Sequence, residues 1–170
     1  MEPKKMSESL VVKTAIILPP DTNNHGTIFG GKTMSYIDEV AGLSAIRHAR
    51  MPVVTASTDS VDFLEPIKTD QAICLESFVT WTNRTSMEVF VKVEGENLFS
   101  GKRTICATAF LTFVALDKEG KPHLIPPVIA ESELEKRLHE TAPERAKLRQ
   151  ERRDRSKAFA REFSMNNFKE

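Results

Sequence analysis

Residues 21–50 read DTNNHGTIFGGKTMSYIDEVAGLSAIRHAR, and this stretch decides the fold. Polar residues and a Gly-Gly pair come first. Residues 31–50 then carry apolar side chains at spacings of three and four, which predicts a helix. The side predicted to face the core carries Met34, Ile37, Ala41, Ala45 and His48. Because small residues are frequent on this side, we expect a sheet to pack closely against the helix.

Five strand-like segments flank this helix. One precedes it, at residues 10–18, and is ended by a Pro-Pro pair. Four follow it without another helix between them, at residues 53–63, 72–81, 86–94 and 104–116. The last is apolar on both parities, which indicates a central strand. Short turns between consecutive strands favour an antiparallel sheet, and one helix can cover only one face. The sequence therefore predicts an α+β fold in which a curved antiparallel sheet wraps around one long central helix.

The C-terminal part has a different composition. Residues 130–163 are strongly helical and charged, with many Glu and Lys/Arg pairs four positions apart. Pro143 interrupts the pattern, so we expect one or two peripheral helices with a frayed end near Asn166 and Asn167. This division predicts a domain at residues 8–127 and a charged helical extension at residues 128–170.

Composition and charge exclude several classes of protein. The chain has 170 residues, is 40% hydrophobic and has a formal net charge of zero, so no global charge directs it to nucleic acid or an anionic membrane. The basic run at residues 149–161 is interleaved with acidic residues, which favours a solvated helix face. We expect no signal peptide and no membrane span. Cys74 and Cys106 lie in apolar alternating segments, and buried free thiols there suit a reducing cytoplasm.

Asp38 and the glycine pair are the first chemical candidates. Asp38 lies about two helical turns after Gly31 and returns to the same face of the helix. A carboxylate beside an apolar stripe is costly unless it is paired or functional, although a solvated helix aspartate is an equal alternative. Gly30 and Gly31 at a helix start could hold a carbonyl oxygen, or could simply make the loop flexible. Glu39 lies about 100° further round and reads as a surface charge.

Other polar residues allow two interpretations each. Asn23, Asn24 and His25 favour turn and cap chemistry, and no serine or cysteine nucleophile stands beside His25. The four histidines show no zinc spacing, so we expect no metal site. The Arg84-Thr85-Ser86 segment is either a solvated hairpin corner or a phosphate contact that uses the guanidinium and the hydroxyls.

Taken together, these motifs resemble a known family. Residues 23–32, followed by Asp38-Glu39-Val40-Ala41, resemble the signature of hotdog-fold acyl-CoA thioester hydrolases, in the branch that includes the cytosolic acyl-CoA thioesterases. Further matches at residues 62–67, 83–89 and 113–117 occur in the order of the family. The resemblance spans about residues 15–127 and does not extend with the same strength into the charged tail.

The resemblance implies a function, an assembly and a set of site residues. It implies hydrolysis of acyl-CoA to a carboxylic acid and coenzyme A, without a cofactor, since coenzyme A is part of the substrate. Asn23 and Asp38 correspond to the active-site asparagine and the catalytic acid of the family, contributed by opposite protomers of a dimer. Arg84, Thr85 and Ser86 resemble the region that contacts coenzyme A. Such dimers commonly assemble further as a trimer of dimers, so we expect a homo-oligomer.

Two alternatives from other classes stay open. A hotdog enoyl-CoA hydratase uses an Asp-x-Asn-x-x-His pattern, but His25 comes one residue too early after Asp21 and Asn23. A non-catalytic acyl-CoA sensor would need a DNA-binding module, and neither end of the chain resembles helix-turn-helix. The hydrolase is therefore the favoured reading.

Overall fold

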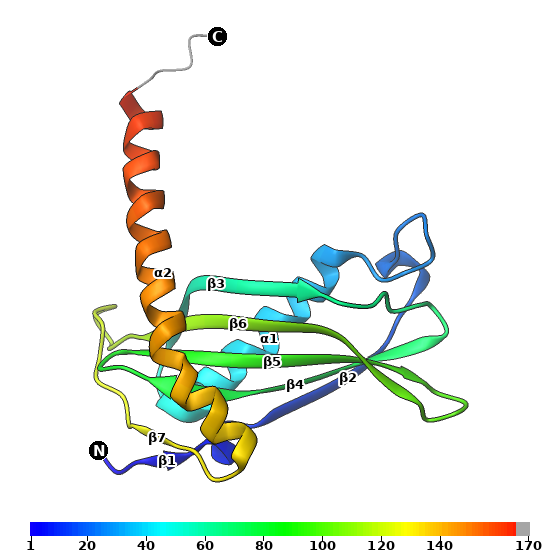
Figure 1. Cartoon of the computed structure of the whole chain (residues 1–170), viewed down its shortest axis with the longest axis horizontal. Coiled ribbons are helices and arrows are strands. Elements are labelled where there is room, and N and C mark those ends of the chain that lie inside the picture. The colour runs from blue at the N-terminus through cyan, green and yellow to red at the C-terminus, as the bar shows by residue number, and fades with distance from the viewer. Residues whose placement is uncertain (166–170) are drawn as a thin grey trace.

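The computed structural model describes residues 1–165 and confirms the predicted architecture. Five antiparallel strands form one sheet in the order β2-β4-β5-β6-β3, and the long helix α1 lies against one face (Figure 1). The elements are β2 Val11–Ile16, α1 Gly30–Ala49, β3 Val53–Phe63, β4 Gln71–Thr82, β5 Ser86–Asn97 and β6 Arg103–Ala115. Each agrees with its predicted segment to within a few residues.

The strand order separates interior strands from edges. The strand predicted to be central, β6, is an interior strand, but the middle position belongs to β5. Strands β2 and β3 are the two edges of the five-stranded sheet, so β3 has hydrogen-bonding groups along one side that no described strand pairs with. This edge runs beside α1 and carries part of the candidate site.

Helix α1 packs closely on the sheet because the residues at the contact are small. The Ser77 hydroxyl on β4 donates to the Val40 carbonyl at 2.9 Å, and the Ser44 hydroxyl donates to the Ser77 carbonyl at 3.0 Å. All four atoms are buried, so the hydrogen bonds replace lost contacts with water. Four of the five predicted core positions of the helix are buried, but Met34 is 47% exposed. It lies about one turn before Asp38, which accepts a hydrogen bond from Thr55 on the edge strand β3.

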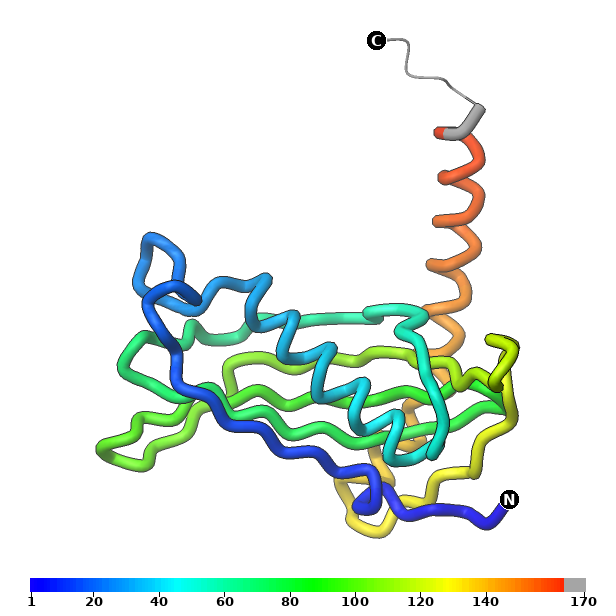
Figure 2. The backbone as a smooth tube through the Cα atoms, turned by 180° about the vertical axis from the view of Figure 1, so that it is seen from behind, coloured from blue at the N-terminus to red at the C-terminus, as the bar shows by residue number. Residues whose placement is uncertain are grey.

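The C-terminal helix lies on the opposite face of the sheet. Helix α2 spans Glu133–Met165, and the two views place the sheet between α1 and α2 (Figures 1 and 2). Of the one or two helices expected here, the structure has one: it continues through Pro143, and its axis changes direction near the middle (Figure 1). Proline removes one backbone donor and crowds the preceding turn, which bends a helix without necessarily ending it. The predicted frayed end at Asn166 and Asn167 lies outside the described residues.

A buried ion pair attaches α2 to the sheet. Glu88 on β5 is completely buried and receives two hydrogen bonds from the Arg145 guanidinium, at 2.7 and 3.0 Å. The Thr80 hydroxyl donates a third at 2.8 Å, and the guanidinium lies 4.3 Å from the centre of the Phe110 ring. The carboxylate is thus neutralised by a planar bidentate partner that also stacks on an aromatic face.

The sequence analysis missed four short elements. They are β1 Lys4–Lys5, the 3-10 helices Met6–Ser9 and Pro19–Asp21, and β7 Val128–Ile129, which pairs in parallel with β1. His48 of α1 lies beneath this pairing, with Nε2 2.8 Å from the Pro126 carbonyl, and burial lowers its pKa. The boundary placed after residue 127 stays a prediction. No helix within residues 1–165 is long and apolar enough to cross a membrane.

Removal of Arg145 tests how much the buried ion pair contributes to stability. Arg145→Ala should lower the free energy of unfolding by about 3–5 kcal/mol, because it leaves the Glu88 carboxylate buried without its partner. Urea unfolding at a fixed protein concentration measures the change. Lys136→Ala, which removes an ion pair to the exposed Glu133, is the matched control and should change little. Equal stability of the two variants would contradict the prediction.

Candidate active site

Asn23 organises the loop that precedes α1. Its side-chain oxygen accepts hydrogen bonds from the backbone N–H of His25 at 2.9 Å and of Thr27 at 3.3 Å, and its backbone N–H donates to the Thr27 carbonyl at 2.9 Å. Its amide nitrogen donates to the Thr27 hydroxyl at 3.0 Å. In the single chain Asn23 therefore has the turn role that its residue type favours, and His25 is exposed beside it.

Helix α1 begins without a side-chain cap. Phe29 occupies the N-cap position, and its carbonyl accepts from the N–H groups of Lys32 at 2.9 Å and Thr33 at 3.1 Å. Within residues 1–165 no acceptor is found for the N–H groups of Gly30 and Gly31. These two donors lie at the positive end of the helix dipole, which suits an anion or a polarised carbonyl oxygen.

The position of the Phe29 ring explains why a glycine stands at residue 31. A Cβ atom on Gly31 would lie 2.5 Å from Phe29 Cε1, so a larger residue would displace the ring. The ring itself is 59% exposed. Nearby, Lys32 forms an ion pair with Asp21 at 3.1 Å, and the hydrogen bond to this carboxylate raises the pKa of Lys32. The helix start is thus covered by an aromatic ring beside a neutralised pair of charges.

A cavity of about 320 Å³ opens beside the helix start. Its wall is mostly apolar and comes from the loop before α1, the start of α1, the end of β3 with the segment that follows it, and β6. The lining residues are Thr27, Ile28, Gly30, Thr33, Phe63, Leu64, Glu65, Pro66, Ile67, Cys106 and Ala107. A cavity of this size and character can hold a flexible apolar chain.

Asp38 lies about two turns further along α1 and faces the edge strand. The Thr55 hydroxyl on β3 donates to Asp38 Oδ1 at 3.0 Å. The sequence argument assumed that Asp38 would lie near buried apolar residues, but in the single chain it is exposed. Its position on the helix falls at the border of the buried stripe, beside the sheet edge with which no described strand pairs. Glu39 is a surface charge as predicted, paired with Lys13 at 2.6 Å.

One protomer does not bring all the predicted residues together. Asn23, Gly30 and Gly31 lie at the end of β3, where a Cβ atom on Gly30 would be 3.8 Å from the Phe63 ring. The Arg84-Thr85-Ser86 turn lies at the other end of the sheet, since the Thr85 carbonyl accepts from Ala115, the residue paired with Val53 at the start of β3. Asp38 lies between the two groups.

The Arg84 turn borders a second, polar cavity. This cavity of about 590 Å³ lies between the outer face of the sheet and α2 and is lined by Thr85, Ser86 and Trp81. Helix α2 contributes Arg149, Arg152 and Arg153 to its wall. The expectation of a purely solvated basic face is therefore wrong for Arg149 and Arg152, which form ion pairs with Asp59 at 3.1 and 2.7 Å. Arg84 itself is exposed and does not line this cavity.

Thr55 is the residue that the sequence analysis missed. It stands in a run of small and β-branched residues where a hydroxyl is common, and no spacing links it to Asp38 along the chain. The contact arises only when β3 folds beside α1. The available signal was the presence of hydroxyl residues on the strand that follows the helix, among them Thr55. Within residues 1–165, no group of three His, Cys, Asp or Glu side chains could hold a metal ion.

The chain is similar in sequence and fold to known acyl-CoA thioester hydrolases. A model of the thioesterase superfamily matches residues 25–98. An uncharacterized acyl-CoA thioester hydrolase of Bacillus subtilis (strain 168), YkhA, is 56% identical over 94% of this chain and 92% of its own. The solved apo-hexameric acyl-CoA thioesterase is 51% identical, with a TM-score of 0.87 over 89% of this chain and 97% of that chain.

A third similar protein has been solved with ligands and as variants. The acyl-CoA hydrolase of Staphylococcus aureus, in complex with butyryl coenzyme A and coenzyme A, is 45% identical, with a TM-score of 0.91 over 95% of this chain and 98% of that chain. Alanine variants of one asparagine, one aspartate and one threonine of that hydrolase have also been solved. The asparagine precedes the aspartate by 15 positions and the threonine follows it by 17, the same spacings as Asn23, Asp38 and Thr55 here.

The two cysteines allow a test of the buried interior, and Cys106 also lines the first cavity. Cys74 and Cys106 are free and buried, and burial raises the pKa of both thiols. Less thiolate is then present at pH 8 than in a free thiol, so Ellman's reagent should react with the native protein more slowly than with glutathione. Unfolding in urea without reductant should release two reactive thiols. Rapid reaction of the native protein, or none after unfolding, would contradict this reading.

Proposed function

The chain belongs to the acyl-CoA thioester hydrolases of the thioesterase superfamily, and we propose that Asp38 is the carboxylate on which its hydrolysis of acyl-CoA depends. The observation that carries the proposal is the hydrogen bond from Thr55 to Asp38, formed by two residues whose spacing matches two of the residues replaced by alanine in the Staphylococcus aureus hydrolase. A carboxylate that accepts a hydrogen bond from a hydroxyl is held in a fixed orientation. Asp38 then acts as general base on a water molecule or attacks the thioester carbonyl directly.

The start of α1 supplies the second part of the proposed chemistry. The free N–H groups of Gly30 and Gly31 would donate to the carbonyl oxygen of the thioester and stabilise the negative charge that develops there. Asn23 would orient the water or the carbonyl. Its amide group bonds to Thr27 within the same loop, and a substrate atom would replace that partner. The apolar cavity beside Gly30 would hold the acyl chain or the pantetheine arm.

The site requires two protomers in this proposal. Within one chain Asn23 and Asp38 do not meet, and Asp38 is exposed beside an unpaired sheet edge. A second copy placed along β3 would cover Met34 and Asp38 and bring its own helix start toward them. The hexameric state of a 51% identical thioesterase supports such an assembly, and a trimer of dimers fits it.

The nucleotide end of the substrate would bind near the β4–β5 turn. Thr85 and Ser86 offer hydroxyls at the mouth of the polar cavity, and Arg84 offers an exposed guanidinium beside it. Coenzyme A carries phosphate groups, which guanidinium and hydroxyl groups recognise well. The substrate itself brings coenzyme A, so the proposal includes no separate cofactor. A cytoplasmic location and a domain at residues 8–127 with a C-terminal extension complete it.

Replacement of Asp38 tests the proposed role directly. Asp38→Asn should lower the turnover of an acyl-CoA by about 10²–10⁴-fold, because the amide can neither accept a proton nor attack. The thiol released from a panel of acyl-CoA substrates measures turnover. Glu39→Gln is the matched control, because this neighbouring carboxylate is exposed and paired with Lys13, and its activity should stay near that of the unmodified protein.

The same panel separates the alternatives. Released thiol marks a hydrolase, loss of enoyl absorbance marks a hydratase, and binding without turnover marks a sensor. Near-normal hydrolysis by Asp38→Asn, with the oligomer intact by light scattering, would remove Asp38 from the mechanism.

Mixed oligomers test whether the site is shared between protomers. Asn23→Ala and Asp38→Asn are each expected to be inactive. If the site takes Asn23 from one chain and Asp38 from the other, a heterodimer of the two variants contains one site without either change. Random mixing after unfolding and refolding together should then restore about a quarter of normal activity. A mixture that stays inactive although mass spectrometry detects heterodimers would contradict the shared site.

A further inference from the structure

Strand β3 is irregular next to Asp38. Its register against β6 shifts twice, between Thr55 and Ser57 and again between Thr58 and Ser60. Ala56 and Asp59 are thus extra residues without a partner on β6, and each forms a β-bulge. Bulges change the direction of side chains, because they break the strict alternation between the two faces of a sheet.

The first bulge places the side chains of Thr55 and Ser57, which are two positions apart, on opposite faces of the sheet. Thr55 pairs with Phe113, whose ring packs near Gly42 of α1, and its hydroxyl reaches Asp38 on that face. Ser57 pairs with Thr112 and points to the other face, where its hydroxyl accepts from Arg152 of α2 at 2.8 Å. Without the extra residue, Thr55 and Ser57 would lie on one face. The bulge therefore allows β3 to contact Asp38 and α2 at once.

The second bulge is held almost entirely by α2. The Asp59 carbonyl, released from the ladder, accepts from Arg152 Nη1 at 2.8 Å. Asp59 Oδ1 accepts from Arg152 Nη2 at 2.7 Å, and Oδ2 accepts from Arg149 at 3.1 Å and from the Thr112 hydroxyl at 2.7 Å. The Asp59 side chain is only 10% exposed. Asp59, Thr112, Arg149 and Arg152 form the unit that is called the clamp below.

We propose that Asp59, gripped by Arg149 and Arg152, is a positioning residue for hydrolysis: the clamp fixes the bulged part of β3 and thereby the Thr55 hydroxyl that orients Asp38. Asp59 acts through the backbone, since it lies on the face of the sheet opposite to Asp38. The physical need is specific, because β3 is an edge strand and its bulged residues lack the ladder bonds that hold a regular strand. The clamp replaces those bonds with charge-assisted ones.

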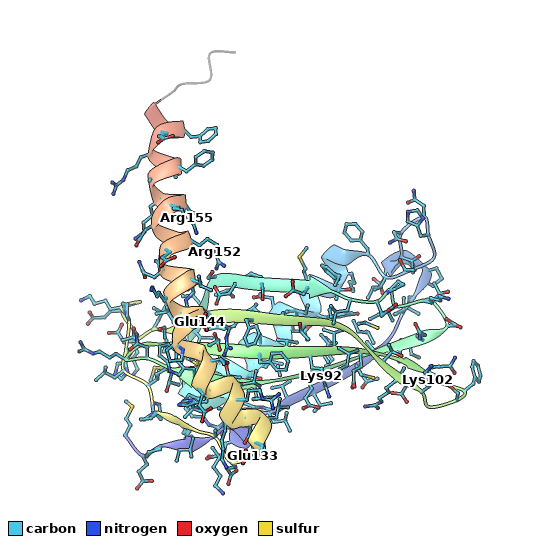
Figure 3. All side chains as sticks on the ribbon, viewed as in Figure 1. Lys92, Lys102, Glu133, Glu144, Arg152 and Arg155 are labelled. Carbon is cyan, nitrogen blue, oxygen red and sulfur yellow. The ribbon has the colours of Figure 1, made fainter. Side chains whose placement is uncertain are left out.

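The placement of α2 fits this role. Arg152 lies on the half of α2 beyond Glu144, where the helix passes the β3 edge, and Arg155 lies about one turn further on (Figure 3). The ion pair of Glu88 with Arg145, about two turns before Arg152, docks the helix on β5. The helix therefore has one attachment at the interior of the sheet and a second attachment at the bulge. This second attachment is what the proposal assigns to catalysis.

The first experiment measures kcat and KM in the full-length protein. Asp59→Ala and Arg152→Ala should lower kcat by about 10–100-fold, since small displacements of a catalytic group cost that much, and leave KM within about twofold. Arg152→Lys, which retains one charged donor, should recover part of kcat. Arg155→Ala is the matched control and should behave like the unmodified protein. A rise in KM with normal kcat would instead assign Arg152 to substrate binding in the polar cavity and would overturn the proposal.

A double-mutant cycle tests the route through Thr55. In the unmodified protein, Asp59→Asn should lower kcat clearly. In a Thr55→Ala background the hydroxyl that the clamp positions is absent, so adding Asp59→Asn should lower kcat little further. Additive losses would mean that the clamp acts only on general stability and would overturn the proposal. Asp59→Asn is nearly isosteric and keeps the bond to Thr112, so the cycle decides the question even if Asp59→Ala fails to fold.

The proposal rests on the proposed role of Asp38, and the two can fail separately. Normal activity of Asp38→Asn would remove the mechanism itself. Loss of activity in Asp38→Asn and Thr55→Ala, together with unchanged kcat in both clamp variants, would leave the mechanism in place and refute the clamp alone.

Discussion

The close contact between α1 and the sheet is the constraint on which the rest of the structure depends. Ser44 and Ser77 meet through hydrogen bonds that small neighbours such as Ala41 and Ala45 make room for. A helix held at this distance passes directly beside the edge strand β3. Because the helix cannot move away, a carboxylate at its border must face that edge, and the first turn must face the segment after β3. The chemistry of the site follows from how close the two layers lie.

Much of this architecture could be predicted from local patterns. The period of the helix, the alternation in the strands and the short turns are properties of neighbouring residues, and they gave the order and type of all the main elements. Pro143 left open whether the C-terminal part forms one helix or two, because a proline removes one backbone donor and can bend a helix without ending it. The short β1–β7 pairing was missed because two residues carry no periodicity.

The site was less accessible to sequence reasoning. Asp38 was a candidate from its place on the helix alone, but Asn23 read as turn chemistry, and only the resemblance implied a catalytic role for both. Thr55 depends on a contact between elements that no local pattern encodes. Asp59 depends on two shifts of register and on a helix about 90 residues later. Asp38 was placed beside an apolar stripe, with a solvated carboxylate as an equal alternative, and in one protomer its side chain is exposed.

The Phe29 ring has a consequence for the strength of the helix start. Most helices begin with a polar side chain that occupies the first N–H groups, whereas here a hydrocarbon ring lies against Gly31. The ring offers these donors no acceptor, and within residues 1–165 no other acceptor is found for them. Donors without an internal partner break no hydrogen bond of the protein when they bind a ligand oxygen. The glycine at this position leaves room for the ring, and so a hydrocarbon stands where a competing polar cap would be.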